Sequence, residues 1–201
     1  MNNSLFSLVR ALIWLTVVGL FIGLLHPYDL LVALALGAKL VLYFLVEFRR
    51  LGLQGKIMAS GAIITAVLGV GAELWGIHSD YWVYHNLSGG RQFPLWLPFA
   101  WGLAFIFLYR LELRLFSEWG LRTPIAKAVT VLLISLIYPT VGEVITITLG
   151  VWHYQNLGPG IAGVPYVAML LLMLLHAGVY LILMLFYHRK LTVPANCRTV
   201  E

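Results

Sequence analysis

The sequence predicts an all-α integral membrane protein that forms a single transmembrane domain of about six helices over residues 1–201. Of its 201 residues 61% are hydrophobic and only 10% are charged, whereas a soluble domain keeps roughly a quarter of its residues charged. The apolar residues form six runs, each close to the length of about 20 residues that crosses a bilayer as a helix. Lipid is therefore the expected solvent of this chain. A pattern of polar and aromatic residues also recurs in the second half.

Short polar, charged or glycine- and proline-rich segments separate the six runs. The first run is longer than the core of a signal peptide and no small-residue cleavage pattern follows it, so we expect it to be retained. Residues 110–124 are expected to connect two spans, because they are rich in charge. The predicted spans are residues 5–25, 30–48, 57–76, 95–111, 125–149 and 164–187.

The positions of lysine and arginine predict the orientation. In a six-span arrangement one side receives only Arg91, and the other receives eleven basic residues. This bias predicts a multi-pass protein of the cell membrane with both termini in the cytoplasm. The net charge of +5 has the same origin, so we expect no nucleic-acid partner. The eleven residues are Arg10, Arg49, Arg50, Lys56, Arg110, Arg114, Arg122, Lys127, Arg189, Lys190 and Arg198.

A group of residues repeats at an offset of seventy positions. A proline opens the next span after each group, Pro94 and Pro165. This register predicts a duplicated two-helix unit whose copies insert in the same orientation. The expected parts are a divergent helix pair at 1–56, the copies at 57–124 and 125–190, and a cytoplasmic tail at 191–201. Glu73, Trp82, Tyr84, Asn86 and Leu87 recur as Glu143, Trp152, Tyr154, Asn156 and Leu157.

The two repeated glutamates are the predicted catalytic residues. Glu73 and Glu143 lie inside predicted spans near the outer end, where a charged carboxylate is costly, so both are expected to face the bundle interior. A neutral carboxylic acid in a dry pocket is the proton donor that an unactivated double bond requires. The alternative is that each glutamate satisfies backbone groups freed by a helix break. Pro139 supplies such a break before Glu143, but span three has no matching proline.

The repeated aromatic and amide residues are predicted to contact the substrate. Aromatic faces stabilise a carbocation without adding to it, which suits Trp82, Tyr84, Trp152 and Tyr154. A belt of interfacial Trp and Tyr is the alternative for the many aromatic residues of these segments. The side chains of Asn86 and Asn156 are expected to orient a water molecule or to hydrogen-bond the repeated Trp and Tyr.

Three other groups of polar residues are less informative. Lys39, near the middle of span two, must pair or line a wet cavity, and we include it among the substrate-contacting residues. His176 is interpreted as a hydrogen-bonded core histidine rather than a proton relay. No metal site and no cofactor are predicted, because the spacing of the histidines and aspartate in the outer segment matches no ligand pair. These residues are His78, Asp80 and His85.

The repeated motif resembles that of the carotenoid hydratases and heterodimer-type lycopene cyclases. The likeness rests on a glutamate followed by the pattern Gly-x-Trp-x-Tyr and on the helix-opening segment 157–165, and it covers residues 71–101 and 142–171. The resemblance implies a small polytopic enzyme of carotenoid biosynthesis that uses acid-initiated carbocation chemistry on an isoprenoid end group. The acidic pair that the cyclases carry where the helix opens, in a Pro-Leu-Glu-Glu type sequence, is replaced here by Trp96-Leu97 and Val167-Ala168.

The sequence leaves catalysis and binding both open. The preferred hypothesis is a membrane protein that binds or modifies a long apolar isoprenoid by hydration or cyclisation. One alternative is a small carrier that uses the glutamate pair as a proton or ion site. Another is a non-catalytic subunit that packs against a membrane partner or a second copy through small residues. Those small residues are Gly69, Gly71, Gly76 and Gly142.

Overall fold

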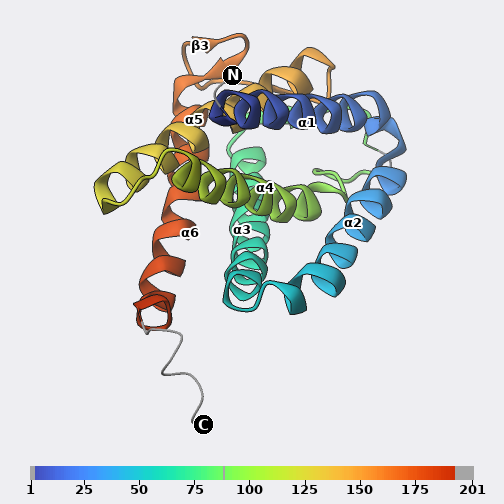
Figure 1. The fold of residues 1–201 in the computed structure, drawn as a ribbon. Helices are drawn as coiled ribbons and strands as arrows, with labels where there is room; N and C mark the ends of the chain where they lie inside the picture. The colour runs from blue at the N-terminus through green and yellow to red at the C-terminus, as the bar shows by residue number, and fades with distance from the viewer. Residues whose placement is uncertain (1–2, 88, 193–201) are drawn as a thin grey trace.

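The computed structural model describes residues 3–87 and 89–192, and most of them are helical (Figure 1). Residues 193–201, which hold nearly all of the predicted tail together with Cys197 and Arg198, lie outside the described part. The helices are α1 (Asn3–Leu25), the short 3-10 helix η1 (His26–Tyr28), α2 (Asp29–Arg50), α3 (Leu53–His78), α4 (Leu97–Glu118), α5 (Pro124–Thr148) and α6 (Tyr166–Thr192). The strands are β1 (Trp82–Tyr84), β2 (Trp152–Tyr154), β3 (Gly160–Ile161) and β4 (Val164–Pro165).

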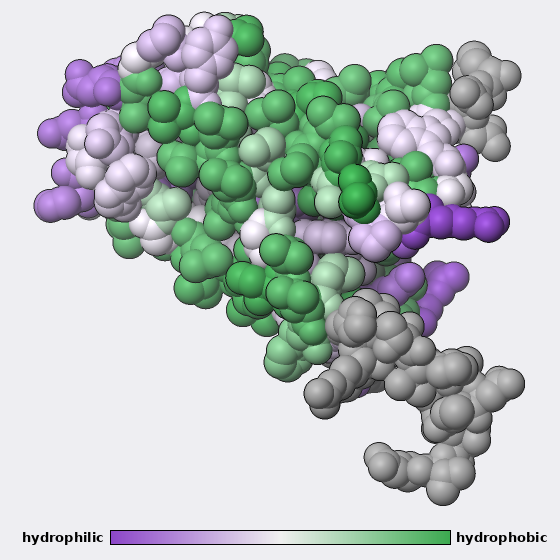
Figure 2. All heavy atoms as spheres, turned by 90° about the vertical axis from the view of Figure 1, so that its left-hand side faces the viewer, coloured by the Kyte–Doolittle hydropathy of each residue, from purple (hydrophilic) through white to green (hydrophobic). Residues whose placement is uncertain are grey.

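Four helical segments are long and apolar enough to cross a membrane. Figure 2 shows apolar residues covering the middle of one face of the molecule, with hydrophilic residues gathered at its two opposite ends. The prediction of a mostly helical chain with several helices able to span a bilayer is therefore confirmed. The segments are Ser4–Glu47, which includes both α1 and α2, Leu53–His78, Pro124–Thr148 and Tyr166–Tyr187.

Helix α4 corrects one predicted boundary. Its first residue is close to the expected start, but the helix continues to Glu118 through residues that we expected to form a connection. The reason is a buried stripe at helical spacing, in which Leu108, Leu111, Glu112 and Leu115 are all at most 6% exposed. Arg114 and Glu118 are exposed and Arg110 pairs with Glu47, so the high charge of the segment does not end the helix.

The helices cross around α3, which packs most extensively against α4 (Figure 1). Helix α5 packs against α6 and α1, and α6 also contacts α3. Glycines on α3 permit the close approach of α4: a Cβ at Gly61 would overlap the ring of Phe105, and one at Gly69 would overlap the indole of Trp101. Ile57 and Met58 of α3 complete this core and are almost fully buried.

A buried aspartate joins the start of α2 to the segment before α4. Asp29 is 3% exposed. It accepts a hydrogen bond from the Arg91 guanidinium at 2.6 Å and another from the backbone N–H of Leu95 at 2.8 Å. These bonds attach the chain before α4 to the break between α1 and α2, where η1 contains Pro27.

Two short antiparallel β-pairs follow α3 and α5, where the sequence predicted only connections. Strands β3 and β4 form a hairpin whose turn residues, Ala162 and Gly163, both have positive φ, as a tight two-residue hairpin turn requires. Strands β1 and β2 pair with each other, so they join two segments that are seventy residues apart.

Candidate functional site

The pairing of β1 with β2 places the first motif (residues 73–87) directly against the second motif (residues 143–157). Trp82 lies opposite Tyr154, and Tyr84 lies opposite Trp152. Two further hydrogen bonds have matching positions in the motifs. The N–H of His85 donates to the carbonyl of Val151 at 2.9 Å, and that of Gln155 donates to the carbonyl of Tyr81 at 2.6 Å. The motifs therefore contact one another reciprocally.

The backbone of the two motifs follows the same path. The N–H of Tyr81 donates to the carbonyl of Gly76 at 2.9 Å, and the N–H of Val151 donates to that of Thr146 at 3.0 Å. These bonds close the ends of α3 and α5, and the preceding residue has positive φ in each case. The repeated asparagines also share a left-handed conformation, with φ of 57° at Asn86 and 53° at Asn156.

Each repeated glutamate accepts hydrogen bonds from the aromatic residues of its own motif. The Oε2 atom of Glu73 accepts one from the indole N–H of Trp82 at 2.8 Å and one from the hydroxyl of Tyr84 at 2.9 Å. The Oε2 atom of Glu143 accepts one from the hydroxyl of Tyr154 at 2.6 Å. All three bonds end on Oε2. The side chains of Trp101 and Trp152 also lie close to the carboxyls of Glu73 and Glu143, respectively.

The two motifs differ beside the tryptophan, where the first has Gly76 and the second has Thr146. A Cβ at Gly76 would overlap the indole of Trp82, so only glycine lets this ring lie against α3 and reach the carboxyl. The matching position in α5 is Thr146, a buried residue whose hydroxyl donates to the carbonyl of Gly142 at 2.9 Å. Both tryptophans pack against the tyrosine of the other motif, Trp152 against Tyr84 with ring centres 5.4 Å apart and Trp82 against Tyr154.

The two tyrosines remain hydrogen-bond donors over the ordinary pH range. Burial raises the pKa of Tyr84 well above its usual value, and the nearby carboxyls of Glu73 and Glu143 raise it further. Burial, followed by the charge of Glu143, has the same effect on the pKa of Tyr154. A protonated phenol points its hydrogen at a carboxyl oxygen, so these bonds persist at neutral and moderately alkaline pH.

Both glutamates line a cavity of about 940 Å³ between the helices. Its volume lies near the upper end of the range of about 300–1,000 Å³ that is usual for ligand sites. Apolar side chains from α1, α2, α4, α5 and α6 form most of the wall. Aromatic side chains that line it include Trp14, Tyr84, Trp96, Trp101, Phe107 and Trp152.

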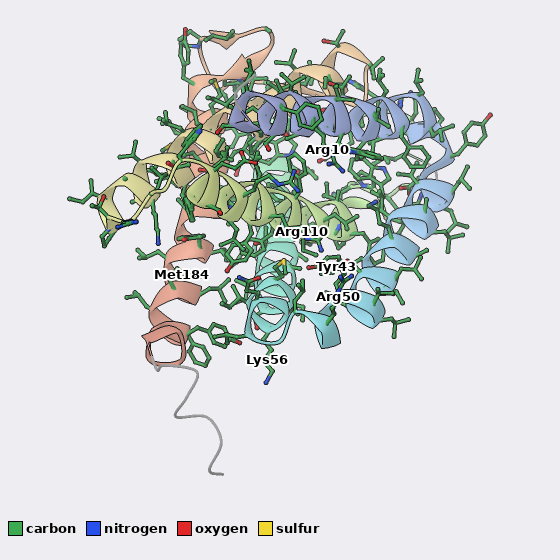
Figure 3. The ribbon with its side chains drawn as sticks, viewed as in Figure 1. Arg10, Tyr43, Arg50, Lys56, Arg110 and Met184 are labelled. Carbon is green, nitrogen blue, oxygen red and sulfur yellow. The ribbon has the colours of Figure 1, made fainter. Side chains whose placement is uncertain are left out.

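An ion pair between Arg110 and Glu47 forms another part of the cavity wall. Their charged groups lie 2.9 Å apart, and the Arg110 guanidinium lies over the ring of Tyr43 at 4.7 Å. Figure 3 shows Tyr43 and Arg110 in the space between α2 and α4. The cavity thus has the two carboxyls and an ion pair on a wall that is otherwise mostly apolar.

The nine predicted site residues occupy three kinds of position. Five of them line the cavity: Lys39, Glu73, Tyr84, Glu143 and Trp152. Trp82 and Tyr154 are not part of the cavity wall but donate hydrogen bonds to Glu73 and Glu143, respectively. Their rings pack edge to face with centres 5.8 Å apart.

The repeated asparagines do not bond to the Trp or Tyr side chains. The Asn86 amide is 3.0 Å from Nε2 of His26, and the Asn156 amide donates to the carbonyl of Asp80 at 3.3 Å. Their recurrence has a conformational reason, because asparagine tolerates the left-handed backbone found at both positions.

Lys39 is exposed toward the cavity rather than paired with Glu73. Within the described part of the chain, no carboxylate forms an ion pair with it. It lies ten residues from the start of α2, whereas Glu73 lies five residues from the end of α3.

The aromatic residues divide between the two interpretations. Tyr28, Trp75 and Tyr166 lie at helix ends and are 48–66% exposed, as expected of an interfacial belt. Trp82, Trp96 and Trp152 are less than 10% exposed and belong to the interior.

The sequence missed one buried polar pair. Glu112 on α4 is fully buried, and its Oε1 atom lies 2.8 Å from Nε2 of His176 on α6. The prediction that His176 is a hydrogen-bonded core histidine is confirmed, and His176 also lines the cavity. Glu112 was assigned to a connection, although its spacing from Leu108 and Leu115 is that of one helix face.

Two further points from the sequence concern a contact with a partner helix and a metal site. Gly69 and Gly76, suggested as a contact for a partner helix, are covered within the chain by Trp101 and Trp82, whereas a Cβ at Gly71 would meet open space. In the described residues no group of three or more His, Cys, Asp or Glu side chains could hold a metal ion.

No protein-family model matches this chain, and neither the comparison with curated proteins nor that with solved structures gives a significant match. The residues and geometry described above are therefore the evidence on which a function can be proposed.

Proposed function

We propose that this chain binds a long apolar isoprenoid lipid in the cavity and modifies one of its end double bonds by acid-initiated chemistry. The observation that carries the proposal is the placement of two carboxyls, Glu73 and Glu143, on the wall of one largely apolar cavity. Each is oriented by aromatic donors on its own motif. The resemblance of these motifs to carotenoid hydratases and lycopene cyclases suggests the same substrate class.

The membrane arrangement that we propose has six crossings with both termini in the cytoplasm. The segment Ser4–Glu47 contains 44 residues, about twice the length that one crossing needs, and η1 interrupts it near the middle. Helix α4 would form a further crossing, with its charged half near the cytoplasmic surface. The lysine and arginine distribution supports this orientation.

The matched motifs support a duplicated two-helix unit, formed by α3–α4 and α5–α6. The common offset of seventy residues extends from side chains to backbone hydrogen bonds and to the positive-φ positions. The reciprocal pairing of β1 with β2 would bring the two acids to one cavity. A chain with this duplication builds both halves of its site from equivalent positions.

In the proposed reaction, one glutamate transfers its carboxyl proton to a carbon of the terminal double bond. The π electrons form the new C–H bond, and a tertiary cation remains on the neighbouring carbon. Water or an internal double bond then supplies electrons to the cation, and a proton returns to the carboxylate. Hydration adds one water, whereas cyclisation leaves the composition unchanged.

The aromatic wall suits the cationic intermediate. Tyr84 and Trp152 line the cavity beside the carboxyls. Trp96 and Trp101 also line it. Ring faces attract a cation without acting as strong nucleophiles, so they lower the energy of the intermediate and leave it free to react with water or an alkene.

A proton-coupled carrier is the second candidate, and the Glu112–His176 pair favours it. The sequence offered few polar groups for the inner half of the bundle, but this pair and the Arg110–Glu47 pair add charge along the cavity. A carrier needs such groups on both sides of the membrane centre. Proton uptake into vesicles that contain the purified protein would distinguish it from an enzyme.

The test of the enzymatic proposal is mass spectrometry of lipids from a host that makes acyclic carotenoids. Cells expressing the protein are compared with cells expressing Glu73→Gln or Glu143→Gln at equal levels. A product heavier by one water, or a cyclic isomer, that is lost in a variant supports the proposal. No new product and no lipid retained on purification would contradict it and favour the carrier or subunit alternatives.

A further inference from the structure

The cavity contains a second polar position that the proposed chemistry does not use. Thr65 on α3 and His176 on α6 both line the cavity, and they are 3% and 4% exposed. The hydroxyl of Thr65 and the Nδ1 atom of His176 are each buried without a hydrogen-bond partner. A buried polar atom left unpaired costs about 1–3 kcal/mol, so a bound group that pairs with both would be favoured.

The hydroxyl of Thr65 on α3 differs from the hydroxyls of α5. All five serine and threonine side chains of α5 donate to the carbonyl four residues earlier in their own helix. This local bond is the usual way to satisfy a hydroxyl inside a membrane helix. Thr65 does not make it, so its hydroxyl remains available to a molecule in the cavity.

Glu112 positions the histidine. Its Oε1 atom holds Nε2 of His176 at 2.8 Å, and the ring lies 5.2 Å from that of Phe105. Whichever of the two side chains carries the shared proton, Nδ1 has one hydrogen bond left to make, as donor or as acceptor. A hydroxyl can serve in both arrangements, whereas an ether or carbonyl oxygen can only accept and a hydrocarbon can do neither.

The distance from the acids favours the two ends of one ligand. Thr65 lies eight residues before Glu73 on α3, which is about 12 Å along the helix axis. This separation is too large for both groups to act on one double bond. It suits a chain whose end double bond lies near the carboxyls and whose polar group lies deeper in the cavity.

We propose that the ligand of this cavity is a long-chain lipid alcohol whose hydroxyl binds between Thr65 and His176. The inference rests on the proposed function, since it names the substrate class of the same cavity. Glu112 acts as a positioning residue that holds the histidine ring. The apolar chain extends from this position toward Glu73 and Glu143.

The test compares a C20 prenyl alcohol with its methyl ether, which has the same chain but no O–H group. Dissociation constants are measured by calorimetry on the purified full chain in detergent micelles. The alcohol should bind the wild type about five- to ten-fold more tightly, the size of one hydrogen bond. Thr65→Val, which keeps the side-chain shape, should remove most of this preference, and His176→Gln should reduce it.

Thr130→Val is the matched control. Its hydroxyl is buried but already bonded to the carbonyl of Ala126, and it does not line the cavity. Equal binding of alcohol and ether to the wild type would overturn the inference, as would a preference that survives both Thr65→Val and His176→Gln. If either outcome occurs while the wild type still forms a lipid product that Glu73→Gln or Glu143→Gln abolishes, the inference fails and the proposed function stands. Failure of both ligands to bind, with no lipid product, would remove the proposed function as well.

Discussion

The first and second motifs share a backbone but hold their glutamates differently. Glu73 is 9% exposed and accepts hydrogen bonds from Trp82 and Tyr84. Glu143 keeps more accessible surface; it accepts a hydrogen bond from Tyr154, and the Trp152 side chain also lies close to it. Gly76 admits the Trp82 ring against α3, whereas Thr146 occupies the matching place in α5. We infer that Glu73 is the more firmly held carboxyl and that Glu143 is the better placed proton donor.

The largest expected effect separates the two acids. Loss of a general acid typically lowers a rate by about 10²–10⁴-fold. Glu143→Gln should fall in this range, whereas Glu73→Gln should reduce the rate less and the thermal stability more. Product formed per hour in isolated membranes and the melting temperature of the purified variants measure the two quantities. Equal losses of rate and of stability in the two variants would contradict the division of roles.

The glycine that distinguishes the motifs gives the next effect. Gly76→Ala would displace the Trp82 indole from Glu73, which should lower the free energy of unfolding by about 1–3 kcal/mol. Gly71→Ala on the same helix is the control. Its Cβ would meet open space, and alanine is favoured over glycine in a helix by roughly 0.5–1 kcal/mol. Similar stabilities of the two variants would show that the Trp82 contact has little importance.

The reverse substitution would make the second motif resemble the first. Thr146→Gly should let the Trp152 indole, which already lies close to Glu143, pack against α5 and hydrogen-bond the carboxyl more tightly. The better-held carboxyl should react up to about five- to ten-fold more slowly, the size of one hydrogen bond. Thr146→Ala removes the hydroxyl but keeps the Cβ that blocks the ring, so it should react like the wild type. The difference between the reaction rates of Thr146→Gly and Thr146→Ala measures the effect of the Trp152 ring position. If Thr146→Ala is also slow, the loss of the hydroxyl is the cause and the explanation fails.

The smallest effect concerns the outer face of the β1–β2 pair. The His85 and His153 rings stack with centres 4.8 Å apart, and partial burial, followed by the neighbouring His153, lowers the pKa of His85. The folded protein then takes up this proton less readily than the unfolded chain. The stability from neutral His85 is complete above the ordinary pKa of about 6.5 and is lost as the pH falls below it.

Melting temperatures measured between about pH 7 and pH 5 would show this decline. His153→Gln should make it shallower, because the neighbouring charge is removed. An unchanged pH dependence in this variant would mean that the stacked histidines do not couple.

Some of the site could be predicted from the sequence, because its signal is a repeated register. The offset of seventy residues links Glu73 to Trp82 and Tyr84, and Glu143 to Tyr154, and the structure shows hydrogen bonds within both sets. The difference between the motifs could not be predicted, because a glycine in place of a threonine acquires its meaning only when the Trp82 ring is seen beside it.

The helical content and the approximate limits of the helices were predictable from apolar runs. The end of α4 was not, since the charge of residues 110–118 concealed a buried stripe. The spacing of Leu108, Glu112 and Leu115 was the available signal, and it would also have placed Glu112 on a buried helix face. The antiparallel contact between β1 and β2 joins distant segments, and no local pattern predicts such a pairing.

The most direct test of the account is the origin of the hydrogen that the lipid gains. Membranes containing the protein are incubated in heavy water with an acyclic polyene, and the product is examined by mass spectrometry after exchange back into ordinary water. If Glu143 donates the proton, the wild type should give one carbon-bound deuterium per product, and Glu143→Gln should give no labelled product. A product that forms without carbon-bound deuterium would contradict proton donation by a carboxyl in the cavity.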